Sequence, residues 1–150
     1  MPALRFAPLT EGDMVELLQW HQDGELARRY GGSDWPRQLQ EVLRTDPARS
    51  CWVVWKDGKR VGYLDFERHP AENLAWIGLA VAPDLRGKGL GRDILQMFLR
   101  ESEAMAFREI RAGIEPDNAA SVAVFSSSGF VPMRSTPDEE GIIDYSFIRQ

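Results

Sequence analysis

The sequence is poor in cysteine and histidine and has no long apolar run. Its 150 residues include one cysteine, Cys51, and two histidines. A single thiol cannot form an internal disulfide or a cysteine cluster for zinc, so we expect no metal. No window approaches the ~20 apolar residues that a membrane span needs, and the first residues lack the apolar stretch of a signal peptide. We therefore expect no membrane contact and a cytoplasmic location.

Positive charge is also scarce. Lys and Arg number 18 against 23 Asp and Glu, which gives a net charge of −5. Domains that bind nucleic acid are normally basic, so we expect no nucleic-acid partner. The acidic balance favours cationic small molecules or basic peptides instead. Apolar residues make up 43% and charged residues 27% of the chain, which is typical of a globular protein, and the length predicts one domain over residues 1–150.

The hydrophobic pattern predicts a mixed α/β fold with helices on both faces of a sheet. Apolar residues at helical spacing indicate helices, and β-branched or aromatic runs bounded by turn residues indicate strands. Gly24 is expected to interrupt the chain after the first helix. The predicted strands cover 4–8, 51–55, 60–68, 74–81, 108–114, 130–133 and 142–148. The predicted helices cover roughly 10–22, 34–43, 92–99 and 119–125.

A glycine-rich segment lies between the strand that ends at Val81 and the helix that follows it. The first N–H groups of a helix have no intrahelical partner and carry part of a positive charge. Glycines such as Gly89 let the backbone approach a ligand without a Cβ clash. Arg86, Lys88 and Arg92 add three cations to this turn. The segment therefore predicts an anion site that suits a pyrophosphate; the alternative is a plain turn without a ligand.

Two common phosphate motifs do not fit this segment. A Walker A loop needs Ser or Thr after the lysine, but Gly89 follows Lys88. The dinucleotide fingerprint needs a third glycine at the position of Arg92, and it belongs to an early βαβ unit.

The segment resembles instead the R/Q-x-x-G-x-G/A motif of the GNAT superfamily of N-acetyltransferases. Arg86 to Gly91 fits this motif, and Asn118 followed by a helix and Gly129-Phe130 fits the second motif of the family. The N-terminal stretch is similar to aminoglycoside 6′-N-acetyltransferases, and the N-x-x-S pattern at Asn118 is similar to the branch that acetylates ribosomal proteins. The resemblance implies a GNAT-like central mixed, mostly antiparallel sheet of six to seven strands flanked by four helices.

The resemblance also implies acetyl-CoA as cosubstrate. The turn amides and arginines would hold its pyrophosphate, the end of the third long strand would pair with pantetheine, and the second motif would lie near the arm and the sulfur. The implied cosubstrate-binding residues are Leu79, Ala80, Val81, Arg86, Gly87, Lys88, Gly89, Leu90, Gly91, Arg92, Asn118, Ser121 and Phe125.

The usual catalytic side chains of the family are absent at two positions. Many members carry a Tyr that protonates the leaving thiolate and a Glu that acts as base; here these positions hold Phe125 and Ala75. The N-x-x-S pattern makes Ser121 the candidate proton donor. The alternative is that Ser121 only packs or caps in the first helical turn.

One strand carries the candidate groups for the acceptor amine. Tyr63, Asp65 and Glu67 alternate onto one face, where Asp65 would hold a substrate ammonium and Glu67 would relay its proton. Trp20 and Trp35 would line the acceptor pocket. The alternatives are a solvated strand face and tryptophans that belong to the core.

These observations predict an acetyl-CoA-dependent N-acetyltransferase that moves an acetyl group directly to a primary amine. The acceptor would be a cationic small molecule or a protein N-terminus. The alternative is a CoA-binding sensor or interaction module with little catalysis. Exposed strand edges leave a homodimer open.

Overall fold

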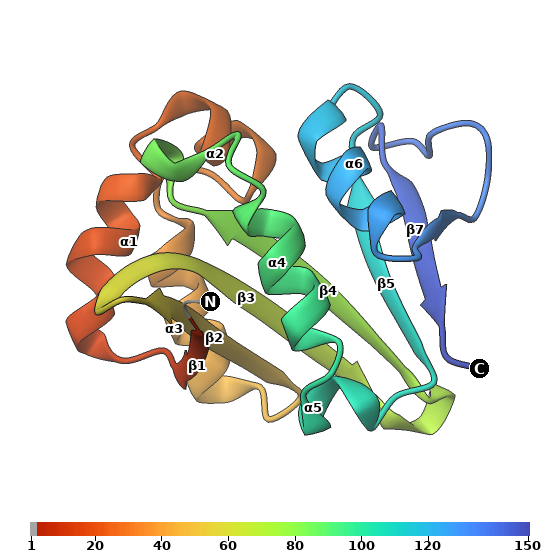
Figure 1. Cartoon of the computed structure of the whole chain (residues 1–150), viewed down its shortest axis with the longest axis horizontal. Coiled ribbons are helices and arrows are strands. Elements are labelled where there is room, and N and C mark those ends of the chain that lie inside the picture. The colour runs from red at the N-terminus through yellow and green to blue at the C-terminus, as the bar shows by residue number, and fades with distance from the viewer. Residues whose placement is uncertain (1–2) are drawn as a thin grey trace. The chain divides into compact units, whose positions relative to one another are not determined.

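A computed structural model describes residues 3–150 and shows a mixed α/β protein (Figure 1). Seven strands form one sheet in the order β1-β2-β3-β4-β5-β7-β6. The strands are β1 (Leu4–Pro8), β2 (Arg49–Lys56), β3 (Lys59–His69), β4 (Leu74–Val81), β5 (Glu109–Ile114), β6 (Val131–Pro132) and β7 (Ile143–Ile148). The helices are α1 (Met14–Trp20), α2 (Gly24–Arg29), α3 (Trp35–Thr45), α4 (Leu90–Phe98), α5 (Ser102–Met105) and α6 (Ala119–Ser127).

The sheet is open and mostly antiparallel. β1 pairs antiparallel with β2, and β7 pairs antiparallel with both β5 and β6. β4 and β5 are parallel, with Leu74 opposite Glu109 and Trp76 opposite Arg111. This arrangement confirms the predicted fold class.

The chain divides into two compact units. The N-terminal unit contains the described residues up to Asp65 together with Leu79–Leu90, and the C-terminal unit contains Phe66–Gly78 and Gly91–Gln150. Strands β3 and β4 contribute residues to both units. One domain over residues 1–150 stays a prediction.

The core of the N-terminal unit joins the predicted apolar faces of α1 and α3. Met14 and Leu17 from α1 and Leu39 from α3 are fully buried. The chain enters α1 through a short 3-10 turn (Glu11–Asp13), where the Thr10 backbone N–H donates to the Asp13 carboxylate at 2.7 Å. Such capping satisfies backbone donors that the first turn leaves without partners.

All four predicted helices are present, and the structure adds α2 and α5. Gly24 begins α2 rather than interrupting the chain, because the Asp23 side chain caps this helix by accepting from the Leu26 N–H at 3.0 Å. Helix α2 has six residues and α5 has four. Both are too short to show an apolar period, which is the signal that indicates a helix in a sequence.

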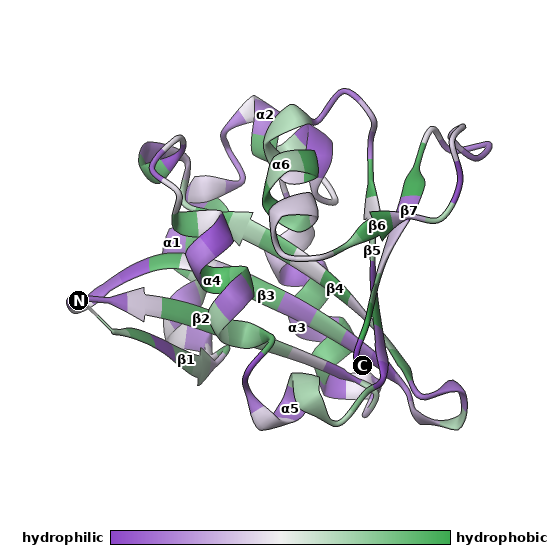
Figure 2. Ribbon diagram, turned by 45° about the vertical axis from the view of Figure 1, so that its right-hand side comes forward, coloured by the Kyte–Doolittle hydropathy of each residue, from purple (hydrophilic) through white to green (hydrophobic). Residues whose placement is uncertain are grey.

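The C-terminal unit has an aromatic core. The Phe66 ring packs edge-on against Phe98 and Phe107, with centroids 5.3 and 5.8 Å apart. Helix α6 is apolar around most of its circumference, as its pale and green colours in Figure 2 show. Among the described residues, none of the helices is both long enough and apolar enough to cross a membrane.

The predicted strand over 130–133 is shorter than expected. β6 contains only Val131 and Pro132, and it forms one edge of the sheet. Proline cannot donate to a strand ladder, so it is confined to edge positions of this kind.

Candidate functional site

The predicted strand–turn–helix is present between β4 and α4. A 3-10 turn (Pro83–Leu85) follows β4, and α4 begins at Leu90. Gly87 and Gly89 have φ angles of 76° and 77°, a region that other residues rarely adopt. A Cβ at either glycine would meet nothing within 4 Å, so the backbone is open to a ligand on this side.

The charges of this turn suit an anion. The side chains of Arg86, Lys88 and Arg92 belong to exposed residues. The N–H groups in the first turn of α4 have no partners within the helix, and the helix dipole adds positive potential there. The turn therefore fits the pyrophosphate of a nucleotide cosubstrate, because backbone and side-chain donors are both available.

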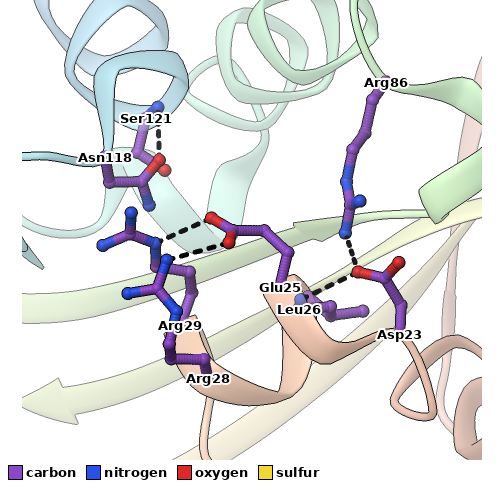
Figure 3. Close-up of polar contacts among 8 residues, drawn as sticks. All are labelled: Asp23, Glu25, Leu26, Arg28, Arg29, Arg86, Asn118 and Ser121. Atoms are coloured by element: carbon purple, nitrogen blue, oxygen red, sulfur yellow. Dashed lines mark hydrogen bonds and ion pairs between the residues drawn. The ribbon is translucent and has the colours of Figure 1, made fainter.

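Arg86 is held by a residue that the sequence did not indicate. Its guanidinium forms an ion pair with the Asp23 carboxylate, and the same carboxylate oxygen caps α2 at Leu26 (Figure 3). The hydrogen bond from Arg86 is the main reason why the pKa of Asp23 is lowered. An Asp before Gly-Glu is a recognisable cap pattern and would have predicted the helix, but not the ion pair.

The second motif forms the start of α6. The Asn118 side-chain oxygen accepts from the Ser121 backbone N–H at 3.3 Å (Figure 3). This cap leaves the Ser121 hydroxyl and the Asn118 amide nitrogen outside the bond. Phe125 is 4% exposed and packs edge-on against Phe130 at 5.0 Å. Ala75 is fully buried in β4, so buried apolar side chains occupy both of these positions.

The proposed acceptor groups of β3 have different surroundings. Tyr63 and Asp65 are buried, so a solvated strand face does not apply to them. The Arg49 guanidinium donates three hydrogen bonds to the Asp65 carboxylate, at 2.7, 2.8 and 3.2 Å. Glu67 lies 3.3 Å from the Nε2 of His69. The roles given to Asp65 and Glu67 stay predictions.

Trp20 and Trp35 both contact the core of the N-terminal unit. Trp20 is buried, and it also lines a groove of about 590 Å³ together with residues of α1 and the 3-10 turn after β4. Trp35 is half-buried, and its ring centroid lies 6.3 Å from that of Tyr30.

A buried histidine completes this region. We define the aromatic cluster as His21, Tyr30, Trp35 and Tyr63. The His21 Nδ1 lies 2.9 Å from the Gly32 carbonyl oxygen, and its Nε2 lies 2.7 Å from the Tyr63 hydroxyl. A carbonyl can only accept, so Nδ1 carries the proton and Nε2 accepts from Tyr63. Burial lowers the pKa of His21, which favours this neutral form.

Comparison with known proteins identifies the family. Residues 14–130 match the acetyltransferase (GNAT) family. The chain is 30% identical to the uncharacterized N-acetyltransferase YfmK of Bacillus subtilis over 93% of each protein. This chain therefore belongs to the GNAT acetyltransferase family, and it is an acyltransferase.

Solved structures agree on the fold. The chain is similar to the aminoglycoside acetyltransferase AAC(6')-Ib in complex with coenzyme A, with 16% identity, a TM-score of 0.82, and coverage of 99% of this chain and 96% of that one. It is also similar to spermidine N-acetyltransferase from Vibrio cholerae in complex with CoA and spermine, with 19% identity, a TM-score of 0.82, and coverage of 97% and 95%.

Proposed function

We propose that this enzyme transfers an acetyl group from acetyl-CoA to the primary amine of a cationic small molecule or a protein N-terminus. The observation that carries the proposal is the turn at 86–92, where two left-handed glycines leave the backbone open beside three cations and the start of α4. The similar structures that contain CoA support the choice of cosubstrate. The net charge of −5 supports a cationic acceptor.

In this proposal, backbone groups hold the cosubstrate at its pyrophosphate and along its pantetheine. The amides from Gly87 to Gly91 bind the pyrophosphate, with Arg86 and Arg92 beside it. The backbone of Leu79–Val81 pairs with the pantetheine. In the second motif, Asn118 binds the pantetheine arm and Ser121 lies near the thioester sulfur.

The chemistry needs one proton acceptor and one proton donor. The neutral amine attacks the thioester carbonyl carbon; the C–N bond forms and the C–S bond breaks. The amine proton passes to Glu67 or to water. The thiolate takes a proton either from Ser121, which regains one from water as it does so, or from water directly, so CoA leaves as the thiol. A backbone N–H of Leu79 or Val81 stabilises the carbonyl oxygen as it gains charge.

A second candidate is a member of this family that binds CoA but transfers the acetyl group only slowly. The buried Phe125 and Ala75 favour it, because neither can donate or accept a proton. Turnover of acetyl-CoA with a panel of amines separates the two candidates, since binding of CoA is common to both. We also propose that the chain forms a single domain and that the protein is located in the cytoplasm. Analytical sedimentation would show whether it forms a homodimer.

The test of cosubstrate binding is Gly89→Asp. The new carboxylate would stand where the pyrophosphate binds, so we expect the affinity for CoA in calorimetry to fall at least about tenfold, since like charges at a binding site cost several kcal/mol.

Gly58→Asp is the matched control. Gly58 has a φ of 76° in the β2–β3 hairpin, and its Cβ would also meet nothing within 4 Å. The control should keep the affinity of the wild type. Unchanged CoA affinity in Gly89→Asp would overturn the assignment of the turn.

A further inference from the structure

Two polar atoms of the aromatic cluster are buried without a hydrogen-bond partner. They are the hydroxyl oxygen of Tyr30 and the indole nitrogen of Trp35. Buried polar groups are paired in the great majority of cases, because burial without a partner costs free energy. Two such atoms on neighbouring rings therefore need an explanation.

The other polar groups around these rings are satisfied within the fold. Both nitrogens of His21 have partners, and one of these is the Tyr63 hydroxyl. The Asp65 carboxylate is held by Arg49. The missing partners thus belong specifically to Tyr30 and Trp35.

Both groups can donate a hydrogen bond, and the Tyr30 hydroxyl can also accept one. An indole N–H can only donate. Burial, and then the charge of Asp65, raises the pKa of Tyr30 well above its usual value, so the hydroxyl keeps its proton. The two rings are neighbours, with centroids 6.3 Å apart. A ligand that satisfies both donors must therefore offer hydrogen-bond acceptors, and an oxygen with two lone pairs is the simplest group that does.

The charges nearby favour an uncharged oxygen. Arg49 compensates Asp65, and His21 is neutral. An ammonium group has donors only and cannot partner the Trp35 N–H. Both residues are half-buried, although their polar atoms are covered.

We propose that Tyr30 and Trp35 form an oxygen-binding subsite for the acceptor. They donate hydrogen bonds to an uncharged oxygen of the acceptor, such as a carboxamide or a sugar hydroxyl. The enzyme therefore favours amines that carry such an oxygen over oligoamines that carry only ammonium groups. This inference rests on the proposed acetyl transfer and narrows its acceptor.

The direct test uses binding without acetyl transfer. Hydrocinnamamide has the carboxamide but no amine, so it cannot be acetylated. We expect it to cause a saturable shift of the Trp35 indole N–H resonance, which Trp35→Phe identifies among the five tryptophans. Tyr30→Phe should weaken this binding. Absence of a saturable shift of the Trp35 resonance would overturn the subsite.

The kinetic test compares phenylalaninamide with phenethylamine, which differ by the carboxamide. Tyr30→Phe should lower kcat/KM about fivefold to tenfold for the amide, as expected for one lost hydrogen bond, and less than twofold for phenethylamine. For each amine the variant is compared with the wild type, so differences in basicity between the amines do not affect the result. Glucosamine tests hydroxyl oxygens in the same way, and spermidine serves as the oligoamine. Equal losses for all amines would contradict the subsite.

Tyr63→Phe is the matched control, because it removes the same atom from a ring whose centroid is 5.4 Å from that of Tyr30. It leaves the Nε2 of His21 without a partner, so the Tm of this variant should fall, while the ratio of amide to phenethylamine turnover should stay the same. Tyr30→Phe should keep or raise Tm; an equal fall would show that the fold itself satisfies this hydroxyl and would overturn the inference. A retained resonance shift without acetylation of any amine would refute the proposed function alone.

Discussion

Tyr30 and Tyr63 carry the same hydroxyl on neighbouring rings, but the fold gives these hydroxyls different surroundings. Tyr63 is fully buried and donates to His21 at 2.7 Å. The Tyr30 hydroxyl is buried without a partner. A hydrogen-bonded hydroxyl contributes to the stability of the fold, whereas a buried hydroxyl without a partner lowers it. Such a group is retained where it binds a ligand.

At the same scale, Ser121 tests the proposed proton donor. We expect Ser121→Ala to lower kcat at least about tenfold and to leave CoA affinity nearly unchanged, because a donor acts mainly in the transition state. The backbone N–H that Asn118 caps is retained, so the free energy of unfolding should fall by no more than about 1 kcal/mol.

Ser127→Ala is the control on the same helix. The Ser127 hydroxyl donates to the Val124 carbonyl at 2.9 Å and has no proposed catalytic role. Single-turnover kinetics, which isolate the chemical step, should show the wild-type rate for this variant. If Ser121→Ala keeps the wild-type kcat, Ser121 is not the proton donor and water is the proton source.

At the scale of elements, the connection between α2 and α3 positions the aromatic cluster. Gly31 has a φ of +81°, and a Cβ there would lie 2.6 Å from atoms of the Trp35 ring. Only glycine therefore lets the ring pack over this backbone. The Gly32 carbonyl, one residue later, accepts from His21.

We expect Gly31→Ala to lower the free energy of unfolding by about 1–3 kcal/mol, through backbone strain and the clash with Trp35. Gly32→Ala separates the two causes, because φ is +96° there but a Cβ meets nothing within 4 Å. Urea denaturation gives the loss in free energy of unfolding for each variant, and the larger loss expected in Gly31→Ala measures the contact with Trp35. Equal losses would show that the contact with Trp35 does not determine the need for glycine.

At the scale of the whole molecule, His21 makes stability depend on pH. Burial lowers its pKa in the folded state, so the unfolded chain binds a proton at higher pH than the folded one. The free energy of unfolding should therefore decrease as pH falls below the unfolded pKa of about 6.5. Protonation would also remove the acceptor of the Tyr63 hydroxyl.

The measurement is urea denaturation between about pH 7 and pH 5, above the range where carboxylates with unfolded pKa values near 4 contribute. Carboxylates such as Glu109, whose pKa is lowered by the hydrogen bond from Arg111, lose their contribution only at lower pH. His21→Gln should flatten the dependence in this window. If the free energy of unfolding of the variant has the same slope against pH, another group causes the dependence.

The sequence alone determined the features that depend on residues close together in the chain. The four longer helices and the turn at 86–92 follow from local periodicity, caps and glycines, and the structure confirms them. Two motifs at family spacing also identified the acetyltransferase class.

Tertiary structure decided which side chains meet. Asp23 and Arg86 are 63 residues apart, and His21 and Tyr63 are 42 apart. No local pattern specifies such pairs, because hydrogen bonds between distant residues depend on how strands and helices pack. For the same reason, the sequence indicated Trp35 as a candidate but gave no sign that Tyr30 would present a second unpaired donor beside it.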